Sequence, residues 1–177
     1  MKPQQAPELQ TSQWFNTDTP ISLKALRGRV VLIEAFQMLC PGCVSHGLPQ
    51  AARVAKTFGR DKVTVIGLHT VFEHHDVTGP SALKAFLHEY RIDFPVGVDL
   101  ASGTGGAPKT MTAYRMQGTP TLILVDALGN LRKQAFGAVE DLALGAEIMA
   151  LIDEREATLT PNKGTQVAGC DDNGCTP

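Results

Sequence analysis

Two cysteines separated by two residues are the most informative chemical feature of the 177-residue sequence. Cys40 closely follows an apolar, β-branched run, and apolar residues at helical spacing begin just after Pro41. A sulfur at such a junction meets unpaired backbone N–H groups and the positive end of the helix dipole, which lower a thiol pKa from about 8.5 into roughly the range 3.5–7.5. Cys40 is therefore predicted to attack as a thiolate, and Cys43 to resolve the mixed disulfide.

A buried acid is expected close to this pair. Glu34 lies six residues before Cys40, inside the apolar run. An unpaired carboxylate buried there would be costly, so its pKa should be raised. The alternative is that Glu34 faces solvent or pairs with a base such as Lys62. His46, three residues after Cys43, could influence either sulfur or bind a metal, although a histidine at this place in a helix is more often simply exposed.

The elements that must position these residues follow from the hydrophobic pattern. Val30–Phe36 predicts a strand buried on both faces, and residues 41–58 predict a helix with a kink at Pro49. Further strands are expected at 63–68, 94–98, 121–125 and 131–136, and further helices at 81–90, 111–116 and 141–156. This order predicts an α/β fold with a central mixed sheet of about five strands, a helical insertion between the second and third main strands, and an N-terminal extension in which Trp14 and Phe15 pack.

The chain divides into a domain over residues 1–158 and a cysteine-containing tail over 159–177. The tail is rich in Gly, Asn, Asp and Thr and carries Cys170 and Cys175. These two cysteines could close a small disulfide or stay free, bind a metal, or serve as an auxiliary redox pair that exchanges electrons with Cys40 and Cys43. The sequence leaves these options open.

Composition argues against several other classes of protein. Apolar residues make up 43% and charged residues 19% of a chain with formal net charge −2, so neither disorder nor membrane insertion is favoured, and no nucleic-acid partner is expected. Residues 1–13 lack the apolar core of a secretory signal, and no apolar run reaches the length of a membrane span. The sequence as written predicts a cytoplasmic protein, or a periplasmic one where a signal or anchor has been removed.

The strand, the C-P-G-C motif, the helix and a later Gly118-Thr119-Pro120 together resemble the thioredoxin superfamily. The segment 26–31 and the insertion resemble its TlpA-like and redoxin branch, related to AhpC/TSA proteins, over about residues 10–155. The resemblance implies a thiol-disulfide oxidoreductase of cell redox homeostasis with no bound cofactor and no metal. Its expected partners are client protein thiols or disulfides and an upstream dithiol reductant, with the chain itself a monomer.

The same resemblance assigns roles to site residues. The Thr119–Pro120 bond should be cis and lie against the sulfurs, where its backbone binds an extended substrate segment beside Pro41 and Gly42. Glu34 is similar to the buried acid of thioredoxins, which relays a proton to or from the resolving cysteine. Leu39 replaces the tryptophan usual before the first cysteine, and Pro-Gly replaces Gly-Pro within the motif, so redox potential and partner choice are not fixed by the resemblance.

Two alternatives share this fold. A thiol-dependent peroxidase of the peroxiredoxin type needs a hydroxyl residue three positions before its cysteine, and that position is Gln37 here. A copper chaperone would use Cys40 and Cys43 as soft ligands for Cu(I), with Met38 or His46 nearby, but such chaperones typically space their cysteines more widely. The two-residue spacing favours the oxidoreductase.

Overall fold

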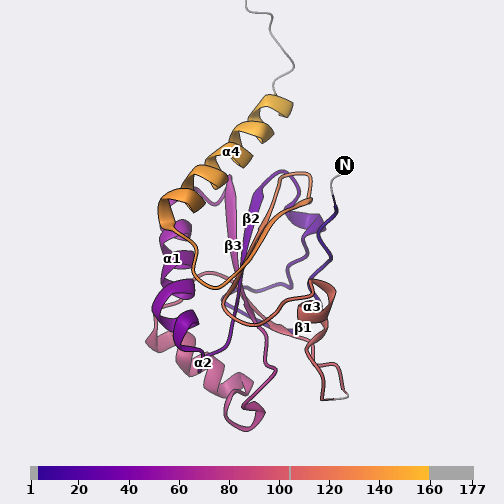
Figure 1. Ribbon diagram of the computed structural model, residues 1–177, viewed down its shortest axis with the longest axis vertical. Coiled ribbons are helices and arrows are strands. Elements are labelled where there is room, and N and C mark those ends of the chain that lie inside the picture. Colours follow the sequence, from indigo (N-terminus) through magenta and orange to yellow (C-terminus); the bar gives the residue numbers. More distant parts are fainter. Residues whose placement is uncertain (1–3, 104, 160–177) are drawn as a thin grey trace, which may run out of the picture.

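A computed structural model describes residues 4–103 and 105–159, and it confirms an α/β fold with a mixed sheet (Figure 1). Cys170 and Cys175 lie outside the described residues. The strands are β1 (Thr11–Phe15), β2 (Val30–Phe36), β3 (Val63–His69), β4 (Val96–Asp99), β5 (Thr121–Val125) and β6 (Leu131–Phe136). The helices are α1 (Leu48–Thr57), α2 (Pro80–Glu89), α3 (Lys109–Ala113) and α4 (Asp141–Leu159), with short turns η1 (Lys24–Leu26), η2 (Cys43–Gly47) and η3 (His75–Val77). None of the helices within the described ranges is long and apolar enough to cross a membrane.

The sheet has six strands in the order β1-β4-β3-β2-β5-β6, with β2 near its centre. All seven residues of β2 are buried, which explains the continuous apolar run. β2 pairs in parallel with β3 and antiparallel with β5. The chain therefore leaves the carboxyl end of a buried inner strand, paired on both sides, just before it reaches Cys40.

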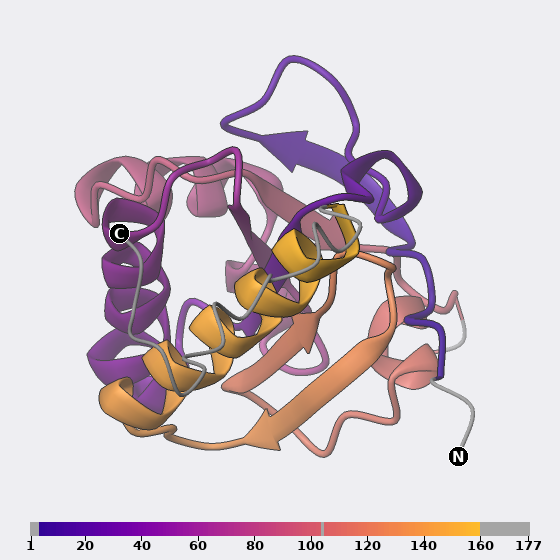
Figure 2. The same cartoon turned by 90° about the horizontal axis from the view of Figure 1, so that it is seen from above.

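Successive residues of β2 supply two separate cores. Leu32 and Phe36 face the side covered by α1, α2 and α4, whereas Ile33 and Ala35 face the side of α3 and the N-terminal segment. Figures 1 and 2 show this division, with α4 running diagonally across its face of the sheet. Burying each such large side chain contributes roughly 1.5–3 kcal/mol, so the two cores fix β2 from both sides.

The first strand is not predicted by the sequence, which indicates only an N-terminal extension in which Trp14 and Phe15 pack. In the structure β1 pairs antiparallel with β4, and Trp14 packs closely against Gly97. A register irregularity between Thr11 and Gln13 interrupts the alternation of buried and exposed residues. The short, interrupted pattern explains why a sheet of about five strands was predicted where six are present.

The helix expected over residues 41–58 is present but divided. Residues Cys43–Gly47 form a π-helical turn, in which the backbone N–H of Leu48 bonds the carbonyl of Cys43 five residues earlier, and α1 follows. Pro49 lies in the first turn of α1, where its missing N–H costs no helical hydrogen bond. The irregularity therefore lies before Pro49, in the π turn, rather than in a kink at the proline.

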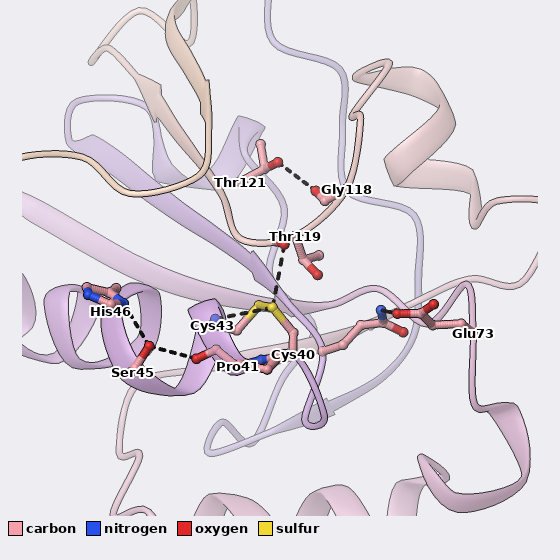
Figure 3. The surroundings of a disulfide bond; sticks show 10 residues. Cys40, Pro41, Cys43, Ser45, His46, Glu73, Gly118, Thr119 and Thr121 are labelled. Carbon is pink, nitrogen blue, oxygen red and sulfur yellow. Dashed lines mark hydrogen bonds between the residues drawn. A yellow bond between two sulfur atoms is a disulfide. The ribbon is translucent and has the colours of Figure 1, made fainter.

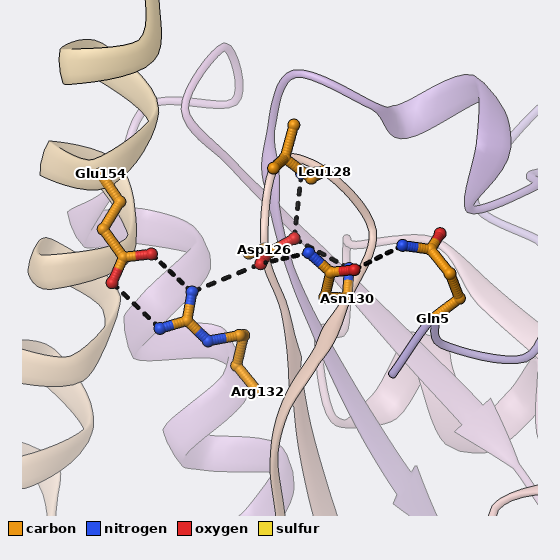
Figure 4. A network of polar contacts seen from close by, with 6 residues as sticks. All are labelled: Gln5, Asp126, Leu128, Asn130, Arg132 and Glu154. Atoms are coloured by element: carbon orange, nitrogen blue, oxygen red, sulfur yellow. Dashed lines mark hydrogen bonds and ion pairs between the residues drawn. The ribbon is translucent and has the colours of Figure 1, made fainter. Parts of the chain in front are cut away.

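A polar network fixes the β5–β6 hairpin to α4 (Figure 4). Asp126, mostly buried, accepts hydrogen bonds from the backbone N–H groups of Leu128 at 3.0 Å and Asn130 at 2.8 Å. Arg132 bridges Asp126 at 3.3 Å and Glu154 of α4 at 2.5 Å. The network holds α4 over the sheet, next to the active-site helix.

Candidate active site

The two cysteines of the C-P-G-C motif form a disulfide at the carboxyl end of β2 (Figure 3). Their Cα atoms lie 5.2 Å apart. Cys43 is fully buried, whereas Cys40 is partly exposed. A partner molecule can therefore reach the sulfur of Cys40 without unfolding the helix, but it cannot reach the sulfur of Cys43.

One backbone N–H at the start of the helical segment points at the sulfur of Cys40. The N–H of Cys43 donates a hydrogen bond to Sγ of Cys40 at 3.2 Å, and the N–H of Val44 bonds the Cys40 carbonyl at 3.1 Å. An N–H aimed at sulfur stabilises a thiolate more than a neutral thiol. The surroundings of Cys40 thus favour a thiolate at this sulfur once the disulfide is reduced.

The segment before β5 lies against the disulfide. The Thr119–Pro120 bond is cis, as the sequence resemblance predicted. The carbonyl oxygen of Thr119 lies 3.5 Å from Sγ of Cys40, and a Cβ added to Gly42 would lie 3.3 Å from Cδ of Pro120. Cys40, Gly42, Thr119 and Pro120 are therefore brought together, while the side chain of Pro41 is exposed at the rim.

Glu34 is buried beneath the active-site helix, with only 1% of its surface exposed. Its Oε1 atom has no hydrogen-bond partner among the described residues, and burial raises the pKa of the carboxyl to about 8. Lys62, the base considered as a partner, instead bonds Glu156 at 2.9 Å. The expected burial of Glu34 is confirmed, and its exposure to solvent or pairing with Lys62 is wrong.

His46 lies on the exposed side of the π turn and bonds Ser45 through Nδ1 at 2.7 Å (Figure 3). Met38, the other residue considered for copper, is buried. Within residues 4–103 and 105–159, no group of three or more His, Cys, Asp or Glu side chains is placed to hold a metal ion. His46 therefore sits on the helix surface, the commoner of the two positions weighed from the sequence.

The residues just before Cys40 differ sharply in exposure. Gln37 is buried, donates to Oε1 of Glu73 at 3.3 Å and accepts the backbone N–H of Phe72 at 3.3 Å. Leu39 is 57% exposed beside the disulfide. Gln37 thus anchors the loop after β3 close to the Cys40–Cys43 disulfide, and Leu39 leaves apolar surface exposed beside it.

A cavity of about 300 Å³ reaches Glu34 from the side of α1 and α4. Gln50 of α1 lines it, is buried, and donates both to the carbonyl of Val139 and to Oδ1 of Asp141, each at 2.7 Å. Asp141 also pairs with Arg53 at 3.1 Å. No pattern in the sequence indicates this cavity, because its lining comes from segments about 90 residues apart that show no shared motif.

His69 is a second buried titratable residue that sequence reasoning missed. It closes β3, is 1% exposed, and packs against Phe36 with ring centroids 5.3 Å apart. Its Nε2 atom has no partner among the described residues, and burial lowers the pKa of the imidazole to about 4. His69 is therefore neutral at pH 7, and it shares the sheet face of Phe36 and Glu34.

Comparisons with known proteins agree with this geometry. The model of the AhpC/TSA family matches residues 3–134. Protein DipZ of Mycobacterium tuberculosis is 32% identical over 136 residues, which are 75% of this chain but 18% of that protein. The chain thus spans less than a fifth of the length of this curated relative.

Two solved structures are similar over nearly their whole length. A crystal structure described as a thioredoxin-like superfamily protein is 60% identical with a TM-score of 0.82, covering 84% of this chain and 96% of that one. A thiol-disulfide isomerase from Corynebacterium glutamicum is 48% identical with a TM-score of 0.80, covering 83% and 96%.

The fold, the disulfide and these likenesses agree with one another. The described domain has the thioredoxin-like fold and carries a CxxC disulfide at the end of its central strand. It is a thiol-disulfide oxidoreductase domain. The chain belongs to the AhpC/TSA family.

Proposed function

We propose that this chain exchanges disulfides with client proteins through Cys40 and Cys43. The Cys40 thiolate attacks one sulfur of a client disulfide, so that the client S–S bond breaks, one client thiolate leaves and a mixed disulfide forms. Cys43 then loses its proton and attacks Sγ of Cys40, which releases the second client thiolate. The client gains two electrons, and the domain is left with the Cys40–Cys43 disulfide.

The single observation that supports this order of attack is that the two cysteines differ in burial and in hydrogen bonding to sulfur. Cys40 is partly exposed and accepts the N–H of Cys43 at 3.2 Å, whereas Cys43 is fully buried. The carbonyl of Thr119 beside Sγ of Cys40 supports a role for the Thr119–Pro120 backbone in holding an extended client segment. Pro41 and Gly42 border the same place.

Glu34 is the proposed proton acceptor for Cys43. Its pKa of about 8 lies close to the ordinary value of a thiol, about 8.5, so a proton can pass between the two groups with little change in free energy. No other carboxyl group among the described residues combines this burial with a raised pKa. Glu34 would therefore hold the proton while Cys43 attacks.

The proposed partners are thiol-bearing client proteins and an upstream dithiol that reduces the Cys40–Cys43 disulfide after each cycle. The likeness to a protein described as a thiol-disulfide isomerase supports client proteins of this kind. The chain is proposed to act as a monomer. Run in reverse, the same two steps would oxidise a client dithiol, and the redox potential of the couple decides the direction.

Turnover of a peptide disulfide and of hydrogen peroxide distinguishes this function from a peroxidase. We expect reduction of the peptide disulfide, driven by dithiothreitol, to depend on Cys40, and peroxide consumption to equal that of a Cys40→Ser control. Gln37 supports this expectation, because its amide is already bonded to Glu73 and Phe72 and it carries no hydroxyl. Rapid Cys40-dependent consumption of peroxide would instead identify a peroxidase.

A further inference from the structure

Gly47, the last residue of the π turn, lies directly on the carboxyl group of Glu34. A Cβ atom added to Gly47 would overlap Oε1 of Glu34 and would lie 3.0 Å from its Cδ. The same Cβ would lie 3.1 Å from Cβ of Pro120. The carboxyl group therefore occupies the space that any other residue at position 47 would fill.

The backbone of Gly47 does not itself require glycine. Its φ of −60° and ψ of −57° are helical, a conformation that every residue adopts. Glycine is among the least favourable residues inside a helix, so its presence here needs another reason. The contacts indicate this reason: glycine at position 47 leaves room for the Glu34 carboxyl group beneath the helix.

The π turn places Gly47 over the Glu34 carboxyl group. In this turn the hydrogen bond from the N–H of Leu48 to the carbonyl of Cys43 spans five residues, one more than in an α-helix, and such turns often occur at functional sites. The turn begins at the resolving Cys43 and ends at Gly47. One local irregularity thus links the buried sulfur with the residue that borders the buried acid.

The cavity that reaches the carboxyl group does not share its lining with the residues around Cys40. Glu34 and Gly47 line it, together with Gln50, whereas Cys40, Thr119 and Pro120 do not. Its other charged or titratable neighbours are His46 on the π turn, Arg53 on α1, and Glu140 and Asp141 at the start of α4. On the sheet itself, His69 of β3 shares the face of Glu34.

We propose that Gly47 is a positioning residue that keeps the Glu34 carboxyl at the boundary between Cys43 and this cavity. The proton that Glu34 takes from Cys43 then leaves through the cavity, past His46 and the Arg53–Asp141 pair, while a client still covers Cys40. This inference rests on the proposed role of Glu34. It adds a route for the proton and a residue that keeps the route open.

The test uses 5,5′-dithiobis(2-nitrobenzoate) and full-length protein carrying Cys170→Ser and Cys175→Ser. Attack by Cys40 releases one thionitrobenzoate and leaves a mixed disulfide, and resolution by Cys43 releases the second. Absorbance in a stopped-flow instrument follows the two releases separately from pH 5 to pH 10. The first release reports Cys40, and the second reports the step in which Cys43 loses its proton.

Gly47→Ala is expected to slow the second release about tenfold near pH 7 and to shift its pH midpoint, with the first release unchanged. The added methyl would overlap the end of the flexible Glu34 side chain and would displace Cβ of Pro120 by only a few tenths of an ångström, so the variant should fold while its carboxyl moves away. Gly145→Ala is the matched control, because a Cβ there, in α4, meets no atom within 4 Å. We expect both releases of the control to match the parent protein.

A shorter acid supplies the rescue. Aspartate lacks one methylene group, so Gly47→Ala combined with Glu34→Asp should recover part of the rate of the second release. An unchanged second release in Gly47→Ala, or equal slowing of both releases at every pH, would overturn the positioning role. Glu34→Gln distinguishes failure of the proposed function from failure of this inference. If the second release is unchanged in Glu34→Gln, the proposed role of Glu34 is wrong as well. If Glu34→Gln slows the second release but Gly47→Ala does not, only the inference about Gly47 is wrong.

Discussion

Replacing Glu34 with glutamine is expected to raise the free energy of unfolding of the oxidised protein by about 3 kcal/mol at pH 7. The carboxyl pKa is about 8 in the folded state, against 4.5 for an ordinary glutamate. Between these two values the folded protein holds a proton that the unfolded chain has released, so raising the pH destabilises the fold. Glutamine has no proton to lose and removes this penalty.

The pH profile of stability checks the sign of this effect. In denaturant unfolding, the stability of the parent protein relative to Glu34→Gln should fall steadily from about pH 4.5 to about pH 8. His69, whose pKa is lowered from 6.5 to about 4 in the folded state, raises the stability of both proteins as the pH rises between these two values, so the parent's own profile should fall most clearly above about pH 6.5. Glu89→Gln, on the exposed surface of α2, controls for the loss of a charge and should follow the parent. Parallel profiles for the parent and Glu34→Gln would contradict the raised pKa of Glu34.

The second large effect concerns the two cysteines. Cys40→Ser should reduce turnover of a disulfide substrate to the uncatalysed rate, whereas Cys43→Ser should stop at the mixed disulfide until an added dithiol cleaves it. Without Cys40 no mixed disulfide forms. Without Cys43 the mixed disulfide forms and persists, because the sulfur that would release the client is missing.

Mass spectrometry of the trapped species separates the two variants. We expect Cys43→Ser, incubated with a disulfide-containing client, to carry the mass of one client chain until dithiothreitol is added, and Cys40→Ser to carry none. The Cys170→Ser/Cys175→Ser background excludes trapping by the tail. Trapping by Cys40→Ser rather than by Cys43→Ser would reverse the assigned order of attack.

Much of the fold was predictable because its central elements have strong local patterns. The bounds of β2, β5 and β6 match the predicted ones, since continuous or alternating apolar residues end there at clear turns. The C-P-G-C motif at a strand-to-helix junction likewise predicted a redox-active cysteine pair, and the structure shows Cys40 and Cys43 joined in a disulfide there. Local patterns and motifs were sufficient to predict those segments whose conformation depends mainly on residues close together in the sequence.

The features that were not predicted depend on contacts distant in the sequence. β1 becomes a strand by pairing with β4, and the pattern at Thr11–Phe15 alone is too short and irregular to indicate it. Glycine at position 47 gives no signal of its own, since its importance arises from the Glu34 carboxyl below it. His69 ends an apolar run, and only the packing around it shows that its imidazole is kept neutral.

Equilibration with glutathione tests the central claim most directly. Full-length Cys170→Ser/Cys175→Ser protein is held at a series of ratios of reduced to oxidised glutathione, and its free thiols are counted by alkylation and mass spectrometry. We predict a reversible two-electron couple between Cys40 and Cys43 with a midpoint between about −270 and −120 mV, the low end marking a reductant and the high end an oxidant. Failure of the pair to form a disulfide at any ratio would contradict thiol-disulfide exchange at this site.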